Sequence, residues 1–248
     1  MKLNKFHLLS LILILAVAVT AFIFYNNSDY KIYQVSTLPD LSAGDFTGFV
    51  SIGSLKHHGD TGIGTFNQLN GEMIVINGTV YQVKNDGSVY TPNDSTTTPF
   101  AMVTYFKTSK TITINRTMSY AEFEQFLNTA LPSNNLFYCF IVTGTYENIT
   151  ARSEPEQYEP YPNLTTALSN QTVFNFTDVG GTMVGFWCPA YAAGVSNNDY
   201  HFHFLSSDKK QGGHVLNCTV KNVTIQIDYI PSMFVLYPNG ETLTMNLR

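Results

Sequence analysis

The 248-residue sequence has few charged side chains and few cysteines, and both shortages exclude whole classes of protein. Only 12% of the residues are charged, with 13 Lys and Arg against 18 Asp and Glu, so the formal net charge is −5. A nucleic-acid interface needs a basic stripe, which this composition does not supply, so we expect no nucleic acid as a partner. The three cysteines allow at most one disulfide, so a disulfide framework does not hold the fold together. There is also no glycine-rich dinucleotide or phosphate loop, and we expect no organic cofactor.

Residues 1–27 are set apart from the rest of the chain by their hydropathy. Lys2 and Lys5 precede an apolar run over residues 8–25. Such a segment is either a secretory signal peptide, with a small-residue cleavage site at Val19–Ala21, or an uncleaved N-terminal membrane anchor. Both interpretations predict an exported protein that is extracellular, secreted or tethered to the outer face of the cell membrane. The chain also carries ten Asn-x-Ser/Thr sequons, which are potential glycan acceptors on an exported protein.

Short strands and tight turns dominate the exported part. Asn70-Gly71, Asn77-Gly78 and Asp86-Gly87 separate short apolar runs and predict a β-meander. One helix is expected over residues 119–130, because a capping box precedes an apolar stripe at three- and four-residue spacing. A long apolar run over residues 136–145 predicts a buried strand. The proline-rich residues 151–163 predict a linker or crossing loop, with Arg152 at its start.

The stretch Tyr200–Val215, YHFHFLSSDKKQGGHV, contains the main candidate site. His201 and His203 alternate with aromatic residues, so a strand would put both imidazoles on one face and the aromatics on the other. A polar segment ending in Gly-Gly then predicts a hairpin that brings His214 beside them. Three imidazoles form a first-row metal site with open coordination positions, for which Zn²⁺ is the first choice. Alternation also puts Cys218 on the same face, although a core role suits that thiol better.

The remaining histidine patterns and Arg152 are weaker indications of a site. A His-x-His pair by itself also recurs on strands that bind no metal, and only the third histidine makes the metal site the stronger interpretation. The adjacent His57 and His58 would point in opposite directions on a strand, so we interpret them as part of a solvated loop. Arg152 is either a structural partner of a carboxylate or a site residue, and the pattern alone favours neither.

The chain from about residue 33 to residue 217 resembles the α-acetolactate decarboxylase family. Six stretches carry the resemblance, in the same order as in the family. They are Gly59-Asp60-x-Gly62-x-Gly64-Thr65, Leu69-x-Gly71-Glu72-Met73, Thr98-Pro99-Phe100-Ala101, Ala151-Arg152-x-x-Pro155-x-Gln157-x-x-Pro160-Tyr161-Pro162, Gly185-Phe186-x-x-Pro189-x-Tyr191-Ala192-Ala193, and His201-x-His203-Phe204 with Asp208-Lys209 and Gly212-Gly213-His214-Val215-Leu216-Asn217.

The resemblance implies an activity and a set of site residues. The family converts 2-acetolactate to acetoin and CO2, with zinc bound by three histidines. Matched by position, the zinc ligands are His201, His203 and His214. The implied catalytic residues are Glu72 and Arg152, and Thr65 and Arg152 are the implied substrate-binding residues.

The resemblance also implies an architecture. It is an α+β, β-rich fold of two domains on mixed and antiparallel sheets, an α+β sheet domain over residues 28–155 and a β-rich metal-binding domain over residues 156–248. The second is expected to be a half-open, barrel-like sheet that carries the three-histidine site, and the protein is expected to be a homodimer. Two departures are visible: His58 stands where the family has a basic arginine, and the family's glutamate from a C-terminal tail has no match at Glu241 before the chain ends at Arg248.

The chemistry of acetolactate fits these residues. The metal would chelate the ketone and hydroxyl oxygens and, as a Lewis acid, stabilise the enediolate left when CO2 departs. The enediolate is then protonated, and Glu72 or Arg152 is the candidate donor. A tight arginine clamp on the substrate carboxylate would hold back the ground state, because that charge disappears in the reaction. We therefore expect Arg152 to face the enediolate or to hold Glu72.

Two other functions compete with this interpretation. A cupin-like metal dioxygenase or isomerase also carries His-x-His on a strand, but usually with a glutamate a few residues later, where this chain has Leu205, Ser206 and Ser207. A non-enzymatic, exported, metal-binding surface glycoprotein would account for the sequons and the low charge. It would not require Glu72, Arg152 and the histidines to match the family in order.

Overall fold

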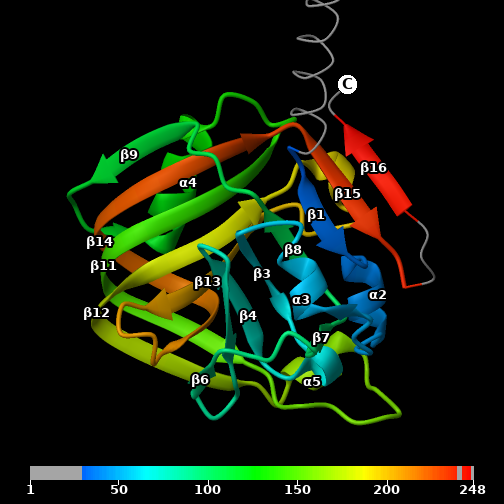
Figure 1. The fold of residues 1–248 in the computed structure, drawn as a ribbon. Coiled ribbons are helices and arrows are strands. Elements are labelled where there is room, and N and C mark those ends of the chain that lie inside the picture. Colours follow the sequence, from blue (N-terminus) through cyan, green and yellow to red (C-terminus); the bar gives the residue numbers. More distant parts are fainter. Residues whose placement is uncertain (1–29, 239–241, 247–248) are drawn as a thin grey trace, which may run out of the picture.

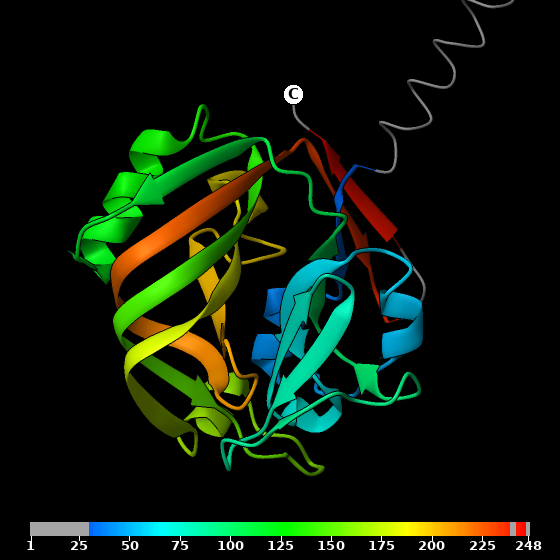
Figure 2. The same ribbon diagram turned by 60° about the vertical axis from the view of Figure 1, so that its left-hand side comes forward.

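The computed structural model describes residues 30–238 and 242–246, and it consists mainly of two β-sheets with a few short helices at their edges (Figure 1). The view in Figure 2 separates the two sheets, with the strands from the middle of the chain on one side and the N-terminal strands on the other. The predicted β-rich fold with mixed and antiparallel sheets is confirmed.

The first sheet has eight strands and contains both the first and the last strands of the described chain. Its order is β16 (Thr242–Asn246), β15 (Ser232–Leu236), β1 (Ile32–Val35), β8 (Ala101–Thr104), β3 (Thr61–Thr65), β4 (Glu72–Ile76), β5 (Thr79–Val83) and β6 (Val89–Tyr90). β1 and β15 run parallel and the other pairs are antiparallel. The turn between β4 and β5 is Asn77-Gly78, with positive φ at both residues, as the sequence predicts.

The second sheet is built on three long strands, β11 (Phe137–Ser153), β12 (Thr172–Trp187) and β14 (Gly212–Ile230). It also contains β9 (Lys110–Ile114), β10 (Met118–Ser119) and β13 (Tyr200–Ser206). β14 pairs along its length with β11, and β11 pairs with β12. The short β13 pairs with β12 on one side and with the start of β14 on the other. The start of β14 therefore lies between β13 and the end of β11.

Short elements complete the described chain. They are the α-helices α2 (Leu38–Ala43), α3 (Ile52–Leu55), α4 (Tyr120–Ala130) and α5 (Leu164–Leu168), the 3₁₀ turns η1 (Asn67–Leu69) and η2 (Ala190–Ala192), and the paired β2 (Val50–Ser51) and β7 (Thr97–Thr98). The capping box at Ser119 and Glu122 is present, and α4 buries Phe123 and Leu127 against the second sheet. The predicted helix is confirmed.

Apolar side chains form three cores, and the middle one holds the two sheets together. It brings Ile74 and Met102 of the first sheet against Val184, Leu205 and Ile230 of the second. The remaining two cores cover the outer face of each sheet. Hydrogen bonds also cross between the sheets. The Ser153 hydroxyl donates to the Val83 carbonyl at 2.8 Å, His203 bonds to a carbonyl of β4, and Arg152 of β11 donates to Glu72 of β4.

Two local predictions were wrong. Ala151 and Arg152 belong to β11 and not to a linker, because the strand continues to Ser153. Cys218 packs in the core, as the preferred interpretation of this thiol expects, but on the face opposite to His214 and not on the same face. The register shifts between Thr150 and Ala151, which leaves one extra residue in β14 and reverses the alternation after Val215.

The apolar run at residues 8–25 lies outside the described residues. Within residues 30–238 and 242–246, no helix is long and apolar enough to cross a membrane. The domain boundary at residue 155 stays a prediction. The sheets themselves change at other points, because β9 to β14 form the second sheet and β15 returns the chain to the first.

Candidate metal centre and active site

The three predicted histidines converge between the two sheets. His201 Nε2 lies 3.1 Å from His203 Nε2 and 3.1 Å from His214 Nδ1. They are the only group of three or more metal-ligating side chains found within residues 30–238 and 242–246. Their neighbours Tyr200, Phe202 and Phe204 pack in the opposite core, so the alternation along β13 is as predicted.

The hairpin between β13 and β14 sets the position of His214. Ser206 closes the turn, because its backbone N–H donates to the Gln211 carbonyl and its hydroxyl accepts from the Gln211 N–H. Gly213 follows with φ of 136°, and a Cβ there would lie 2.5 Å from the Arg152 carbonyl oxygen. Only glycine lets β14 pass this close to β11. The resulting register places His214 opposite His203 on one side and Arg152 on the other.

Burial keeps the three imidazoles neutral. Desolvation, with a further contribution from the Arg152 charge, lowers the pKa of His201 to about 3. Desolvation likewise holds the pKa of His203 and of His214 well below the ordinary value. His203 Nδ1 lies 2.8 Å from the Met73 carbonyl oxygen, so a neutral ring donates there and leaves a lone pair on Nε2. Neutral rings with an oriented lone pair are the form that binds metals.

Glu72 comes from the first sheet and reaches the histidines across the interface. Its Oε2 lies 3.3 Å from His203 Nε2. Burial raises the pKa of the Glu72 carboxyl to about 7, and the Arg152 charge opposes that rise. Thr65 is paired with Glu72 in the β3–β4 register and is buried, and its hydroxyl donates to the Gly71 carbonyl at 2.8 Å. That bond holds the turn from which β4 starts with Glu72.

Arg152 lies between two carboxylates. Its Nη1 donates to Glu72 Oε1 at 2.8 Å and forms an ion pair with Glu154 Oε1. Desolvation lowers the pKa of the guanidinium, and the Glu72 charge raises it. Arg152 therefore does hold Glu72, one of the two arrangements that the sequence suggests.

A small cavity opens onto this cluster. Its volume is about 140 Å³, and His201, His214, Glu72, Arg152 and Thr65 all line it. Leucine and phenylalanine side chains make up much of its remaining wall, namely those of Leu38, Leu41, Leu69, Phe100 and Leu164. A largely apolar pocket with a few convergent polar groups is the usual form of a small-molecule site.

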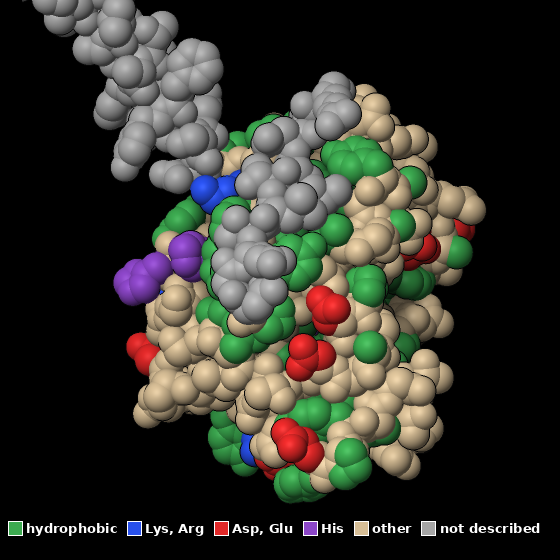
Figure 3. Space-filling view, turned by 90° about the vertical axis from the view of Figure 1, so that its right-hand side faces the viewer, with side chains coloured by type: hydrophobic (Ala, Val, Ile, Leu, Met, Phe, Trp, Pro, Cys, Tyr) green, Lys and Arg blue, Asp and Glu red, His purple; other side chains and the backbone are tan. Residues whose placement is uncertain are grey.

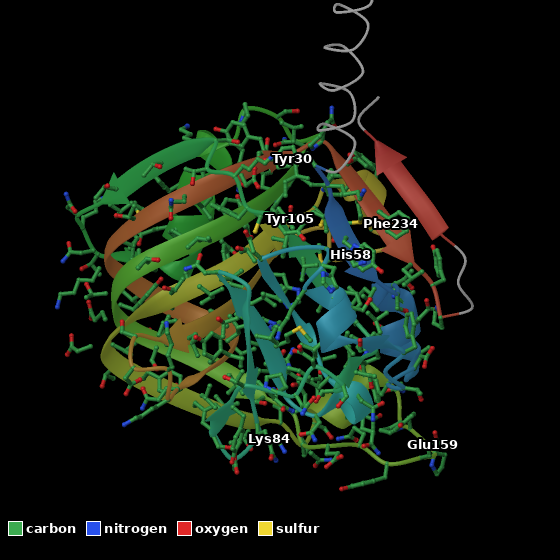
Figure 4. The ribbon with its side chains drawn as sticks, viewed as in Figure 1. Tyr30, His58, Lys84, Tyr105, Glu159 and Phe234 are labelled. Carbon is green, nitrogen blue, oxygen red and sulfur yellow. The ribbon has the colours of Figure 1, made fainter. Side chains whose placement is uncertain are left out.

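The structure brings every predicted site residue together and adds residues that the sequence analysis missed. Glu154 and Asn197 also line the cavity. Glu154 had a detectable signal: it follows Arg152 by two residues, so an extended chain puts both side chains on one face. Asn197 lies in a loop, where no periodicity marks it. Away from the site, His58 stacks on Tyr33 with ring centroids 3.8 Å apart, and Phe234 stacks on the same tyrosine. Figure 4 labels His58, which follows α3, and Phe234 on β15.

The fold and the cluster together describe a β-rich protein with a buried three-histidine site beside paired acidic and basic groups. A family model, alpha-acetolactate decarboxylase, matches residues 32–246. The chain belongs to the alpha-acetolactate decarboxylase family.

Individual relatives agree with this assignment. The chain is 43% identical to the alpha-acetolactate decarboxylase of Methanosarcina mazei over 211 residues, which cover 85% of this chain and 73% of that protein. It is 36% identical to that of Bacillus licheniformis, covering 85% and 83%. The crystal structure of alpha-acetolactate decarboxylase from Bacillus subtilis strain 168 superposes with a TM-score of 0.83 at 36% identity, covering 84% of this chain and 89% of that one.

Proposed function

We propose that this chain is a metal-dependent carboxy-lyase that converts 2-acetolactate to acetoin and CO2. Its membership of the alpha-acetolactate decarboxylase family supports the reaction. The observation that carries the proposal is the cluster of three neutral imidazoles, two of which line a cavity together with Glu72 and Arg152. A cupin-like oxygenase and a non-enzymatic glycoprotein are set aside, because neither accounts for the family match over residues 32–246.

The histidine cluster fits a divalent first-row ion, and we propose Zn²⁺. Tetrahedral zinc with bonds of about 2.0–2.1 Å to nitrogen places its ligand atoms about 3.3 Å apart. The separations of 3.1 Å from His201 Nε2 to His203 Nε2 and to His214 Nδ1 are close to that spacing. His201, His203 and His214 would hold the ion and leave coordination positions open toward the cavity. When bound, such an ion supplies Lewis acidity, which stabilises negative charge on the substrate oxygens.

The residues of the chain account for the remaining requirements of the reaction. The C1–C2 bond of acetolactate breaks and CO2 leaves. The electron pair of that bond stays on the substrate, which becomes an enediolate between C2 and C3. A proton must then reach C2 to give acetoin. We propose that Glu72 carries this proton at Oε2, the oxygen nearer to His203, while Arg152 holds Oε1. Thr65 positions Glu72 through the Gly71 turn and contributes to the substrate-binding wall.

The test is turnover of acetolactate by the full chain. We expect purified, zinc-loaded protein to release acetoin from racemic acetolactate, and His201→Ala protein prepared in the same way to release none above background. Gas chromatography for acetoin and metal analysis of both samples give the readout. If zinc-loaded wild-type protein, shown to contain one ion per chain, leaves acetolactate unchanged, the proposed activity is wrong.

We further propose the finer architecture and setting implied by the sequence. Pairing of β13 with both β12 and β14 supports a half-open, barrel-like second sheet, and the separate cores on the two sheets support two domains. A homodimer would be tested by light scattering of the purified chain. Export, with the N-terminal segment either cleaved or retained as an anchor, would be tested by fractionation and N-terminal sequencing. Figure 3 shows one face of the molecule, on which a few acidic side chains lie among polar and apolar ones.

A further inference from the structure

Glu154 is a second buried carboxylate in the site, and neither the proposed chemistry nor the sequence analysis uses it. It directly follows β11, is 3% exposed and lines the cavity. Its Oε1 forms an ion pair with Arg152 Nη1, while its Oε2 is buried with no hydrogen-bond partner. A buried carboxylate oxygen without a partner is costly, so this arrangement calls for an explanation.

A purely structural role does not explain the second carboxylate. Glu72 alone neutralises the guanidinium of Arg152 at 2.8 Å. While Glu72 is ionised, before it takes up the proton that it delivers, Glu154 leaves one excess negative charge among these three buried groups, which would destabilise an isolated protein. With a divalent ion on the histidines the same set carries one net positive charge, which matches a substrate with one carboxylate. The charge of Glu154 therefore suits the site with a divalent ion bound and not the protein without the ion.

We propose that Glu154 is a positioning residue that keeps the guanidinium of Arg152 from clamping the substrate carboxylate. The inference rests on the proposed decarboxylation. Arg152 Nη1 is shared between Glu72 and Glu154, so its charge is already directed at two protein carboxylates when substrate binds. The substrate carboxylate loses its charge as CO2 leaves. An arginine gripping that carboxylate would stabilise the ground state more than the transition state and slow the reaction.

The proposal predicts an unusual pair of kinetic changes for Glu154→Gln. The amide keeps the size of the side chain and removes its charge, so only Glu72 still competes with the substrate carboxylate for the guanidinium of Arg152. We expect KM to fall roughly tenfold and kcat to fall by at least as much, because the substrate would be bound more tightly in the ground state than in the transition state. A defect in folding or packing would lower kcat or raise KM, but it would not tighten substrate binding.

Binding without turnover gives an independent readout. Calorimetry with zinc-loaded protein and 2-hydroxyisobutyrate, a 2-hydroxy acid that lacks the ketone, should show roughly tenfold tighter binding to Glu154→Gln than to wild type. Glu154→Asp retains the charge and should return the affinity and KM toward the wild-type values. Glu147→Gln removes a carboxylate from the exposed face of the same strand and should leave both unchanged.

A double-mutant comparison tests whether Glu154 acts through Arg152. In an Arg152→Met background, Glu154→Gln should no longer change the affinity for 2-hydroxyisobutyrate. Unchanged or weaker binding by folded, zinc-loaded Glu154→Gln would overturn the proposal, as would an equal effect in the Arg152→Met background. These outcomes are distinct from a failure of the proposed function, which would appear as inactivity of the wild-type protein in the same assay.

Discussion

Asp228 allows a quantitative test of how the interior of this protein treats charge. It lies on β14 beside Cys139 in the sheet register and is fully buried. Its Oδ2 accepts a hydrogen bond from the Lys107 N–H at 2.9 Å, whereas Oδ1 has no partner. Desolvation raises the pKa of the Asp228 carboxyl to about 7, against smaller opposing contributions from backbone N–H groups. The folded protein therefore binds this proton more tightly than the unfolded chain does.

The sign and size of the pH effect follow from that difference. The stabilisation from the bound proton is complete below about pH 4, declines between about pH 4 and 7, and is absent above that. A pKa difference from 3.8 to about 7 corresponds to at most about 4 kcal/mol. Solvent screening and local relaxation reduce such values, so we expect about 2 kcal/mol. Asp228→Asn removes this titration. The free energy of unfolding of the variant minus that of wild type should therefore be about 2 kcal/mol larger at pH 8 than at pH 4.5.

Urea denaturation of both proteins at several pH values measures this difference. The exposed Asp178→Asn variant serves as the control and should show no comparable trend, since its carboxylate is mostly in water. A difference between Asp228→Asn and wild type that stays constant from pH 4.5 to pH 8 would refute the reasoning. It would mean that water or structural rearrangement solvates Asp228 in the folded protein.

Three further predictions concern the site. Arg152→Lys cannot reproduce a planar guanidinium shared by two carboxylates, so kcat for acetoin formation should fall on the order of 100-fold, and turnover within threefold of wild type would contradict this. His203→Ala should contain no bound zinc by metal analysis. Wild type should lose about 2.7 kcal/mol of its free energy of unfolding when a chelator removes free zinc present at 100 times Kd, and His203→Ala should show no such loss. Gly213→Ala should lower the free energy of unfolding by roughly 1–3 kcal/mol and reduce activity, whereas Gly194→Ala, with open space around its Cα, should do neither.

The parts of the fold that depend on local pattern could be predicted from the sequence. The Asn77-Gly78 turn, the capped helix α4 and the alternation of His201 and His203 each follow from interactions within a few residues. Strand pairing across the chain could not be predicted in this way. No local signal indicates that β1 lies parallel to β15, some two hundred residues later, because that contact depends on how the two sheets pack.

The errors in the site have the same physical origin. Residues 151–163 looked like a linker because of their prolines, yet pairing with β12 keeps the first three of these residues in β11, and β14 pairs with the first two. The extra residue in β14 reversed the face of Cys218, and a bulge of this kind has no sequence signature here. Glu154 was missed because residues 151–163 were interpreted as a linker. Once residues 151–153 are taken as a strand, Arg152 and Glu154 fall on one face.

The location of the site between the two sheets explains why its components come from distant parts of the chain. The second sheet supplies the histidines and Arg152, all on strands whose spacing is fixed by backbone hydrogen bonds. The first sheet supplies Glu72, held by the Met73 and Gly71 carbonyl contacts on either side of it. Neither sheet alone contains both the three imidazoles and Glu72. A change that shifts one sheet relative to the other should therefore impair the proposed proton delivery by Glu72 before it disturbs the histidine cluster.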